Sequence, residues 1–415
     1  MIERAEGTTL IATDGRRFID GVSSLWCNTH GHRHPLIDRA VRGQLDKVAH
    51  TTMLGLSHPG AAELAARLVN VAPPGLTRVF YSESGSTATE IALKMAFQYW
   101  QQRGGQHVRR TSFVHLRGAY HGDTIGAVSV GGIDLFHSAF RPLLFKAHAA
   151  VPGDAEDMAR ILAAHEEELA AVIIEPLVQG AAGMLVHPPG YLRAVRELCN
   201  RHGVLLICDE VATGFGRTGT MFACEQERVS PDLLCLAKGL TGGYLPLAAT
   251  LATERIYKGF LGAHEDFRSF FHGHTYTGNP LACAAALANL DAFWSQRTIV
   301  RLQPKIRLLH DLLGVVASLP EVAEVRGRGF MVGIDLGEHE AAQRLGHRVA
   351  IEARKRGAII RPLGDVVVLM PPLTISASDL RRLVEITAES IQAACSDAYG
   401  GVAEAEQQIA LPRAA

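Results

Sequence analysis

Two charged residues close two successive apolar runs of the chain. Asp209 ends the run in GVLLICDE, and Lys238 ends the run in PDLLCLAKGL, 29 residues later. Such runs are typical of parallel strands buried on both faces, and ligands lie at the carboxyl ends of such strands. Burying a carboxylate or an amine is costly unless it has a partner. We therefore expect both side chains to bind a ligand at one sheet edge. The alternatives are that Asp209 is a structural aspartate and that Lys238 only reaches solvent.

An amine and a carboxylate on neighbouring strand ends match the two anchors of pyridoxal 5′-phosphate. A lysine with a lowered pKa forms a Schiff base, and a carboxylate keeps the pyridinium nitrogen protonated. In SESGSTATEIALK, a strand turns through Gly85 and Ser86 into a helix expected to start near Thr87. The N–H groups there would bind the phosphate, although Ser-Gly-Ser also simply caps helices. Tyr120 follows another strand and would stack on the ring, although a lone tyrosine is more often a core or rim residue.

The segment WCNTHGHRHP raises the alternative of a metal site. His30, His32 and His34 alternate, so on a strand they would share one face, and Cys27 precedes them. Zinc takes three or four such nitrogen and sulfur ligands. Pyridoxal phosphate chemistry needs no metal, so we expect ordinary turn and hydrogen-bonding histidines and no metal here.

The composition excludes several classes of protein. The chain has 415 residues, of which 47% are hydrophobic and 20% charged, and its net charge is -1. It has no basic footprint for nucleic acid, no signal-peptide core at its start, and no run of about 18–20 apolar residues that would span a membrane. Seven cysteines without a CxxC pair indicate a reduced, cytoplasmic chain.

The spacing of apolar residues predicts an α/β protein. A hairpin is expected around Asp14-Gly15, and then an amphipathic helix from Pro35 to about residue 50. Alternating strands and helices predict a large domain at 50–298, and a smaller α+β domain would combine 1–49 with 299–395. Residues 396–415 are expected to form a flexible tail. Glu175, which closes another apolar run, is expected only to shape a strand end.

The motifs together resemble class III (ω-type) aminotransferases of fold type I. The likeness runs from about Glu6 to about Ala394 and rests on DEVATGFGRTG, AKGLTGG, SGSTATE, AYHGDT, EPLVQGAAGM and GHTYTGNP. It implies pyridoxal phosphate, a large mixed, mostly parallel sheet domain with a smaller α+β domain, and a homodimer with shared active sites.

The resemblance also implies roles for individual residues. Lys238 would be the Schiff-base lysine and proton shuttle, and Asp209 would pair with the pyridinium nitrogen. Gly85 and Ser86 would hold the phosphate, Tyr120 would stack on the ring and face the substrate, and His274 and Thr275 would reach the phosphate of the neighbouring subunit's cofactor.

A second group of motifs is similar to the branch of this family that acts in biotin synthesis. These motifs are DGVSSLWCNTHGH, LKMAFQYW, FHGHTYTGNPLACAAALA, IIRPLGDVVVLMPP and CLAKGLTGG. The likeness implies 8-amino-7-oxononanoate as substrate, with S-adenosylmethionine or lysine as amino donor. Trp26 and Gly273 would line the pocket, and Arg361 would receive the substrate carboxylate by a bidentate contact, unless it pairs with Asp365 instead.

Two departures from the branch leave alternatives open. Leu25 stands where some members have tryptophan, so the choice of amino donor stays open. Members usually have a further segment before IERAEG that contributes to the pocket, so a truncated start would leave the pocket open. Two other functions therefore stay open. The chain would be another class III enzyme that acts on an ω-amine, or a pyridoxal phosphate-binding homologue with impaired activity.

Overall fold

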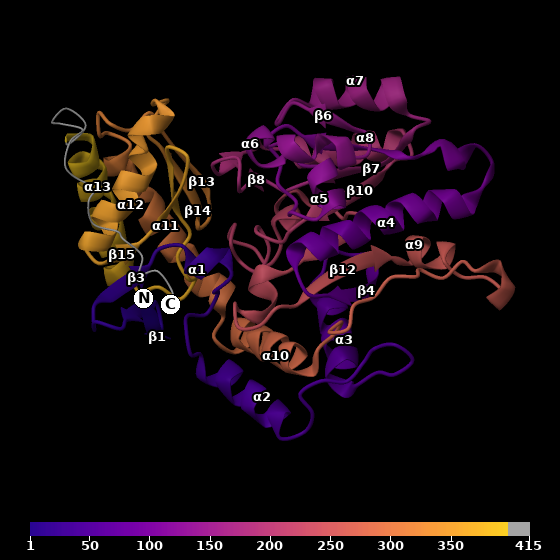
Figure 1. Ribbon diagram of the computed structural model, residues 1–415, viewed down its shortest axis with the longest axis horizontal. Coiled ribbons are helices and arrows are strands. Elements are labelled where there is room, and N and C mark those ends of the chain that lie inside the picture. The colour runs from indigo at the N-terminus through magenta and orange to yellow at the C-terminus, as the bar shows by residue number, and fades with distance from the viewer. Residues whose placement is uncertain (397–415) are drawn as a thin grey trace, which may run out of the picture.

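The computed structural model describes residues 1–396 and is built around a seven-stranded sheet (Figure 1). The strand order is β4 (Leu76–Ser82), β12 (Ala248–Thr253), β11 (Leu233–Leu236), β10 (Leu205–Asp209), β7 (Leu169–Ile174), β5 (Ser112–Leu116) and β6 (Ala147–Ala150). Only β12 runs antiparallel to its neighbours, β11 and β4. The expected mixed, mostly parallel sheet is therefore confirmed.

Alternating side chains of the central strands enter two different packing layers. Leu205 and Ile207 of β10 pack with α4 (Gly85–Arg103), whereas Leu206 and Cys208 pack with the helices on the other face. Those helices are α3 (Pro59–Val71), α7 (Ala155–His165) and α8 (Tyr191–Arg201). Because both faces are covered, nearly every strand residue is apolar, and this explains the continuous runs in the sequence.

A second group of elements forms the other part of the molecule (Figure 1). One sheet has the order β13 (Glu324–Arg328), β14 (Met331–Asp335), β17 (Val366–Leu369) and β16 (Arg361–Leu363). Another has the order β1 (Ile2–Glu6), β2 (Thr9–Ala12), β3 (Arg17–Asp20) and β15 (Ala358–Ile359). The helices here are α11 (Thr298–Val316), α12 (Leu345–Lys355) and α13 (Ala377–Ser396). The hairpin expected around Asp14-Gly15 is confirmed as β2 and β3.

The remaining elements are short or connect these parts. They are α1 (Ser23–Trp26), α2 (Pro35–Leu45), α5 (Ile125–Ser129), α6 (Asp134–His137), α9 (Glu254–Gly259), α10 (Pro280–Ser295), and the small hairpin of β8 (Val178–Gln179) and β9 (Leu185–Val186). The helix expected from Pro35 to about residue 50 ends at Leu45, so its predicted end is wrong. Leu45 and Val48 are exposed, so no packing extends the helix.

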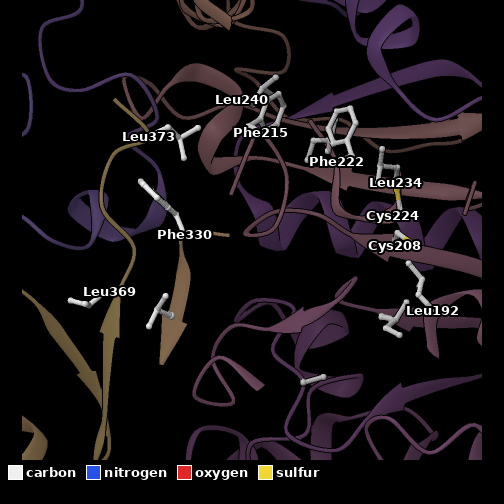
Figure 2. Packing of buried hydrophobic residues seen from close by; sticks show 14 of the residues in the cluster. Leu192, Cys208, Phe215, Phe222, Cys224, Leu234, Leu240, Phe330, Leu369 and Leu373 are labelled. Atoms are coloured by element: carbon white, nitrogen blue, oxygen red, sulfur yellow. The ribbon is translucent and has the colours of Figure 1, made fainter. Parts of the chain in front are cut away.

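One apolar core continues between the two parts. Figure 2 shows Phe215 and Leu240, which follow strands of the large sheet, near Phe330 and Leu373 from the C-terminal part. The strands β3 and β15 pair in parallel, which supports grouping the N-terminal strands with the C-terminal part. Helix α2, by contrast, packs its Ile37 against α10 of the large part. The domain division at 49/50 and 298/299 stays a proposal, and this contact favours placing α2 in the large domain.

Two expectations concern regions outside this arrangement. The tail expected at 396–415 lies, apart from Ser396, outside the described residues. Within residues 1–396, no helix combines the length and the apolar character that crossing a membrane requires.

Candidate active site

Asp209 and Lys238 lie at the ends of neighbouring parallel strands, as the sequence predicts. Asp209 is the last residue of β10 and is in register with Cys235 of β11, and Lys238 stands two residues after the end of β11. Lys238 has φ +41°, a left-handed conformation that is costly for a side chain other than glycine and that clusters at functional sites. Burial lowers the pKa of the Lys238 amine, although the carboxylates of Asp209 and Glu175 oppose the shift. A larger fraction of this amine is therefore unprotonated at neutral pH than for a surface lysine.

The Asp209 carboxylate is buried and held by two contacts. Its Oδ2 lies 2.7 Å from Nδ1 of His121, whose side chain is fully buried, and its Oδ1 accepts a hydrogen bond of 3.0 Å from the Val211 N–H. An ionised carboxylate tolerates such burial because it is paired and hydrogen-bonded. His121 was not expected to take part in the site. The two residues are 88 positions apart in the chain, so no local pattern in the sequence connects them.

The first turn of α4 forms one wall of the site. The helix starts at Gly85 rather than near Thr87, and a capping box between Ser84 and Thr87 fixes its start. A Cβ atom at position 85 would lie 2.5 Å from a Val211 side-chain carbon, so only glycine fits there. The first N–H groups of a helix have no intrahelical partner, and here those of Gly85 and Ser86 border the cavity. This wall can bind an anion such as a phosphate.

These elements enclose one cavity of about 690 Å³. Of the residues that the sequence singled out, it is lined by Trp26, Gly85, Ser86, Tyr120, Asp209 and Lys238. The Lys238 ammonium lies 5.2 Å from the centroid of the Trp26 ring, so the amine faces an aromatic wall. The Tyr120 hydroxyl donates a hydrogen bond of 2.7 Å to Asp123, and burial is the main cause that raises the pKa of this phenol.

The other expected residues lie outside the cavity lining. Leu25 is 47% exposed, although Trp26 next to it is buried. Arg361 is exposed at the start of β16, and its positive charge acts on the Tyr120 phenol. Among the described residues, Arg361 and Asp365 do not form the alternative ion pair. Asp365 pairs with His339 at 3.7 Å instead.

The remaining expected residues border a second cavity. Gly273, His274 and Thr275 line a separate cavity of about 1040 Å³, and His274 pairs with Glu83, which also borders the first cavity. Their expected contact with the cofactor of a neighbouring subunit stays a prediction, because a single chain is described.

Glu175 is part of the site, although the sequence was interpreted as giving it no more than a structural role. It is buried in the cavity wall, where its carboxylate accepts hydrogen bonds from the N–H groups of Tyr120 (3.3 Å) and Gly180 (2.9 Å). Burial raises the pKa of Glu175 to about 7, and the nearby Asp209 adds to the shift. The signal was present, because Glu175 closes an apolar run just as Asp209 does.

We expect the substitution Glu175→Gln to change the pH dependence of stability. The folded-state pKa of Glu175 is raised from 4.5 to about 7, so its contribution to stability is full below pH 4.5 and is lost as pH rises through about 7. The glutamine variant cannot ionise, so its melting temperature should rise relative to the wild type between about pH 5 and pH 8. Thermal denaturation of both proteins with saturating cofactor measures this. The exposed Glu167→Gln is the control, and a difference independent of pH would contradict the burial of an ionisable Glu175.

The three histidines of WCNTHGHRHP are engaged in separate hydrogen bonds. His30 lies between Asn289 (2.9 Å) and Thr298 (3.0 Å), and burial lowers its pKa to about 4. His32 bonds to Asp20 at 2.9 Å, and His34 bonds to Gln296 at 2.7 Å. Each ring therefore makes a hydrogen bond to a different part of the chain, and the expectation of no metal at this segment stays a prediction.

Comparison with known proteins shows the family of the chain. Residues 1–391 match the family model of the class III aminotransferases. The chain is 57% identical over 408 residues to adenosylmethionine-8-amino-7-oxononanoate aminotransferase of Nitratidesulfovibrio vulgaris, with 92% of this chain and 75% of the relative covered. The enzyme of the same name from Aquifex aeolicus is 49% identical over 411 residues, with 93% and 90% covered.

Solved structures agree in fold. The crystal structure of adenosylmethionine-8-amino-7-oxononanoate aminotransferase from Methanocaldococcus jannaschii superimposes with a TM-score of 0.93 at 46% identity, covering 95% of this chain and 93% of that one. A PLP-bound amine transaminase from an uncultivated Pseudomonas species gives a TM-score of 0.88 at 37% identity, covering 95% and 94%. By its family match, its relatives and its fold, the chain belongs to the class III aminotransferases.

Proposed function

We propose that this enzyme transfers an amino group to 8-amino-7-oxononanoate and forms 7,8-diaminononanoate, a step of biotin synthesis. The donor is S-adenosylmethionine, because the relatives at 57% and 49% identity carry adenosylmethionine in their names. The carbonyl oxygen of the acceptor is replaced by an amine, and the donor becomes the corresponding keto compound.

The observation that carries the proposal is the convergence of three groups on one cavity. The Lys238 amine, the Asp209 carboxylate and the N-terminal turn of α4 all border it. They supply a nucleophilic amine, a partner for a protonated ring nitrogen and an anion site. Pyridoxal 5′-phosphate is the cofactor that requires all three, so we propose that Lys238, Asp209, Gly85, Ser86 and Tyr120 hold it.

Within this site Lys238 moves the proton. When bound, pyridoxal phosphate supplies a ring that accepts the electron pair left as a proton leaves the donor's α-carbon. Lys238 Nζ accepts that proton as a general base and returns it as a general acid, and its lowered pKa suits both roles near neutral pH. The Trp26 ring lies against the amine, and Tyr120 lines the same cavity, so both aromatic side chains reduce competing access of water.

In this proposal Asp209 would be the partner of the cofactor's protonated ring nitrogen. His121 and the Val211 N–H fix its orientation. The electrostatic attraction between a buried carboxylate and a protonated nitrogen is stronger than the attraction between the same two groups in water, because the protein interior screens charges less.

We expect the substitution Arg361→Met to weaken binding of the acceptor. Arg361 is exposed near the Tyr120 side of the cavity, and its guanidinium can receive a carboxylate in two parallel hydrogen bonds. Losing a charged hydrogen bond of about 1.5–3 kcal/mol should raise KM about 10- to 100-fold with little change in kcat.

Steady-state kinetics with the acceptor and with a ketone of equal length that lacks the carboxylate measure the effect of Arg361→Met. Only the KM for the acceptor with its carboxylate should rise. The exposed Arg354→Met is the control. An equal loss for both ketones would show that Arg361 does not recognise the carboxylate.

The proposed reaction is tested by product analysis. The purified holoenzyme is incubated with 8-amino-7-oxononanoate and either S-adenosylmethionine or lysine, and 7,8-diaminononanoate is measured by mass spectrometry. We expect product with S-adenosylmethionine. Turnover only of simple ω-amines would favour the second candidate, an amine transaminase, which the 37% identical neighbour supports.

We also propose that the enzyme is a cytosolic homodimer. Exposed apolar side chains gather at or next to the second cavity, and they include Leu54, Leu56, Phe271 and Tyr276. Exposed apolar patches of this kind mark interaction surfaces. A second copy covering this surface would carry its His274 and Thr275 toward the cofactor of its partner. All seven cysteines are free, which fits a reducing compartment.

A further inference from the structure

Two histidines and a glutamate converge at the edge of the large sheet, on elements that contribute nothing to the catalytic cavity. His148 lies on the edge strand β6, His165 is the last residue of α7, and Glu168 lies just before β7. One nitrogen from each histidine and one Glu168 oxygen lie within 4.8 Å of one another. Figure 1 shows β6 and α7 at the edge of the molecule opposite α2 and α10.

The two imidazoles are available as ligands. Their rings stack with centroids 4.0 Å apart at 27°. Nε2 of His148 is buried and has no hydrogen-bond partner among the described residues, which is costly for a polar atom. An unpartnered imidazole nitrogen of this kind is a donor that zinc accepts.

The backbone holds these three positions before any ion binds. β6 pairs in parallel with β5, with Val114 opposite His148. The carbonyl of Glu168 accepts hydrogen bonds from the Thr111 and Ser112 N–H groups, and the Glu168 N–H donates to the His165 carbonyl at 2.8 Å. The three proposed ligands therefore lie on the sheet and on one tight turn. Because this backbone is already ordered, less entropy is lost when the ligands bind a common ion.

We propose that His148, His165 and Glu168 form a site for a zinc ion, with water as the fourth ligand. Two nitrogens and one carboxylate oxygen are ligands that zinc accepts in tetrahedral sites. Ligands about 2.0 Å from a tetrahedral ion lie about 3.3 Å apart, so atoms that now lie within 4.8 Å of one another must approach by at most about 1.5 Å. Glu168 bonds to Lys146 through Oε2 at 2.6 Å, which leaves Oε1 for the ion.

The site is tested by zinc binding to the holoenzyme, measured by equilibrium dialysis. We expect one saturable equivalent per chain and a rise in melting temperature on adding zinc, because an ion that binds only the folded state stabilises it. The double variant His148→Ala/His165→Ala should lose at least tenfold in affinity and lose the rise in melting temperature.

Two controls separate this site from other zinc binding. His202→Ala removes a nearby histidine that pairs with Glu166 at 3.1 Å and is not among the three ligands, so it should bind zinc as the wild type does. Transaminase activity of the double variant without zinc should be unchanged, which shows that the fold is intact. Equal zinc affinity in the wild type and the double variant, or no saturable binding to the wild type, would overturn the proposal.

Discussion

Replacing Lys238 by alanine is expected to abolish transamination and leave the fold intact. Lys238 is the only lysine bordering the cavity among the described residues. We expect the rate to fall by about 10⁴-fold, the upper end of what one positioned acid–base group contributes. Stability should not fall, because the substitution removes an amine whose burial is costly.

Three measurements together test the role of Lys238. Turnover should be lost, the melting temperature should be kept, and added pyridoxal phosphate should bind without covalent attachment. The exposed Lys258→Ala is the matched control and should be fully active. If Lys238→Ala retained near-normal turnover, the assignment of the site would fail.

The second large effect is expected for Asp209→Asn. Asparagine keeps the size of the side chain but removes the charge that would hold the ring nitrogen protonated. We expect the half-reaction with the amino donor to slow by about 10²–10³-fold, as for the loss of one electrostatic contact in an enclosed site. His121 would also lose its charged partner at 2.7 Å.

Single-turnover kinetics with S-adenosylmethionine measure the effect of Asp209→Asn directly. Retention of the cofactor, measured in parallel, separates slow chemistry from loss of binding. The exposed Asp311→Asn is the control. A variant with a normal half-reaction would show that Asp209 is a structural carboxylate, the simpler interpretation of its position.

The catalytic centre was predictable from local patterns because it sits at strand ends. An apolar run followed by a charged residue gives both the strand and its functional end, and this places Asp209 and Lys238 at the ends of neighbouring strands. The start of α4 at Gly85 has an equally local cause, because a strand turns into the helix there and a capping box between Ser84 and Thr87 fixes its first residue. These features depend on a few consecutive residues.

Contacts between distant segments could not be read in the same way. The pair of His121 and Asp209, and the link from Glu175 to the Tyr120 N–H, join loops after three different strands. Their geometry depends on strand order, which no single segment specifies. The end of α2 was misjudged for a related reason, since Val48 fits the helical spacing but finds nothing to pack against.

The most direct test of the central claim is to locate the cofactor on the chain. The holoenzyme is reduced with borohydride, digested, and mapped by tandem mass spectrometry, with a sample first discharged by S-adenosylmethionine for comparison. We predict a pyridoxyl group on Lys238 in the first sample and its loss in the second. Labelling of another lysine, or no label at all on a protein that binds pyridoxal phosphate, would contradict the site described above.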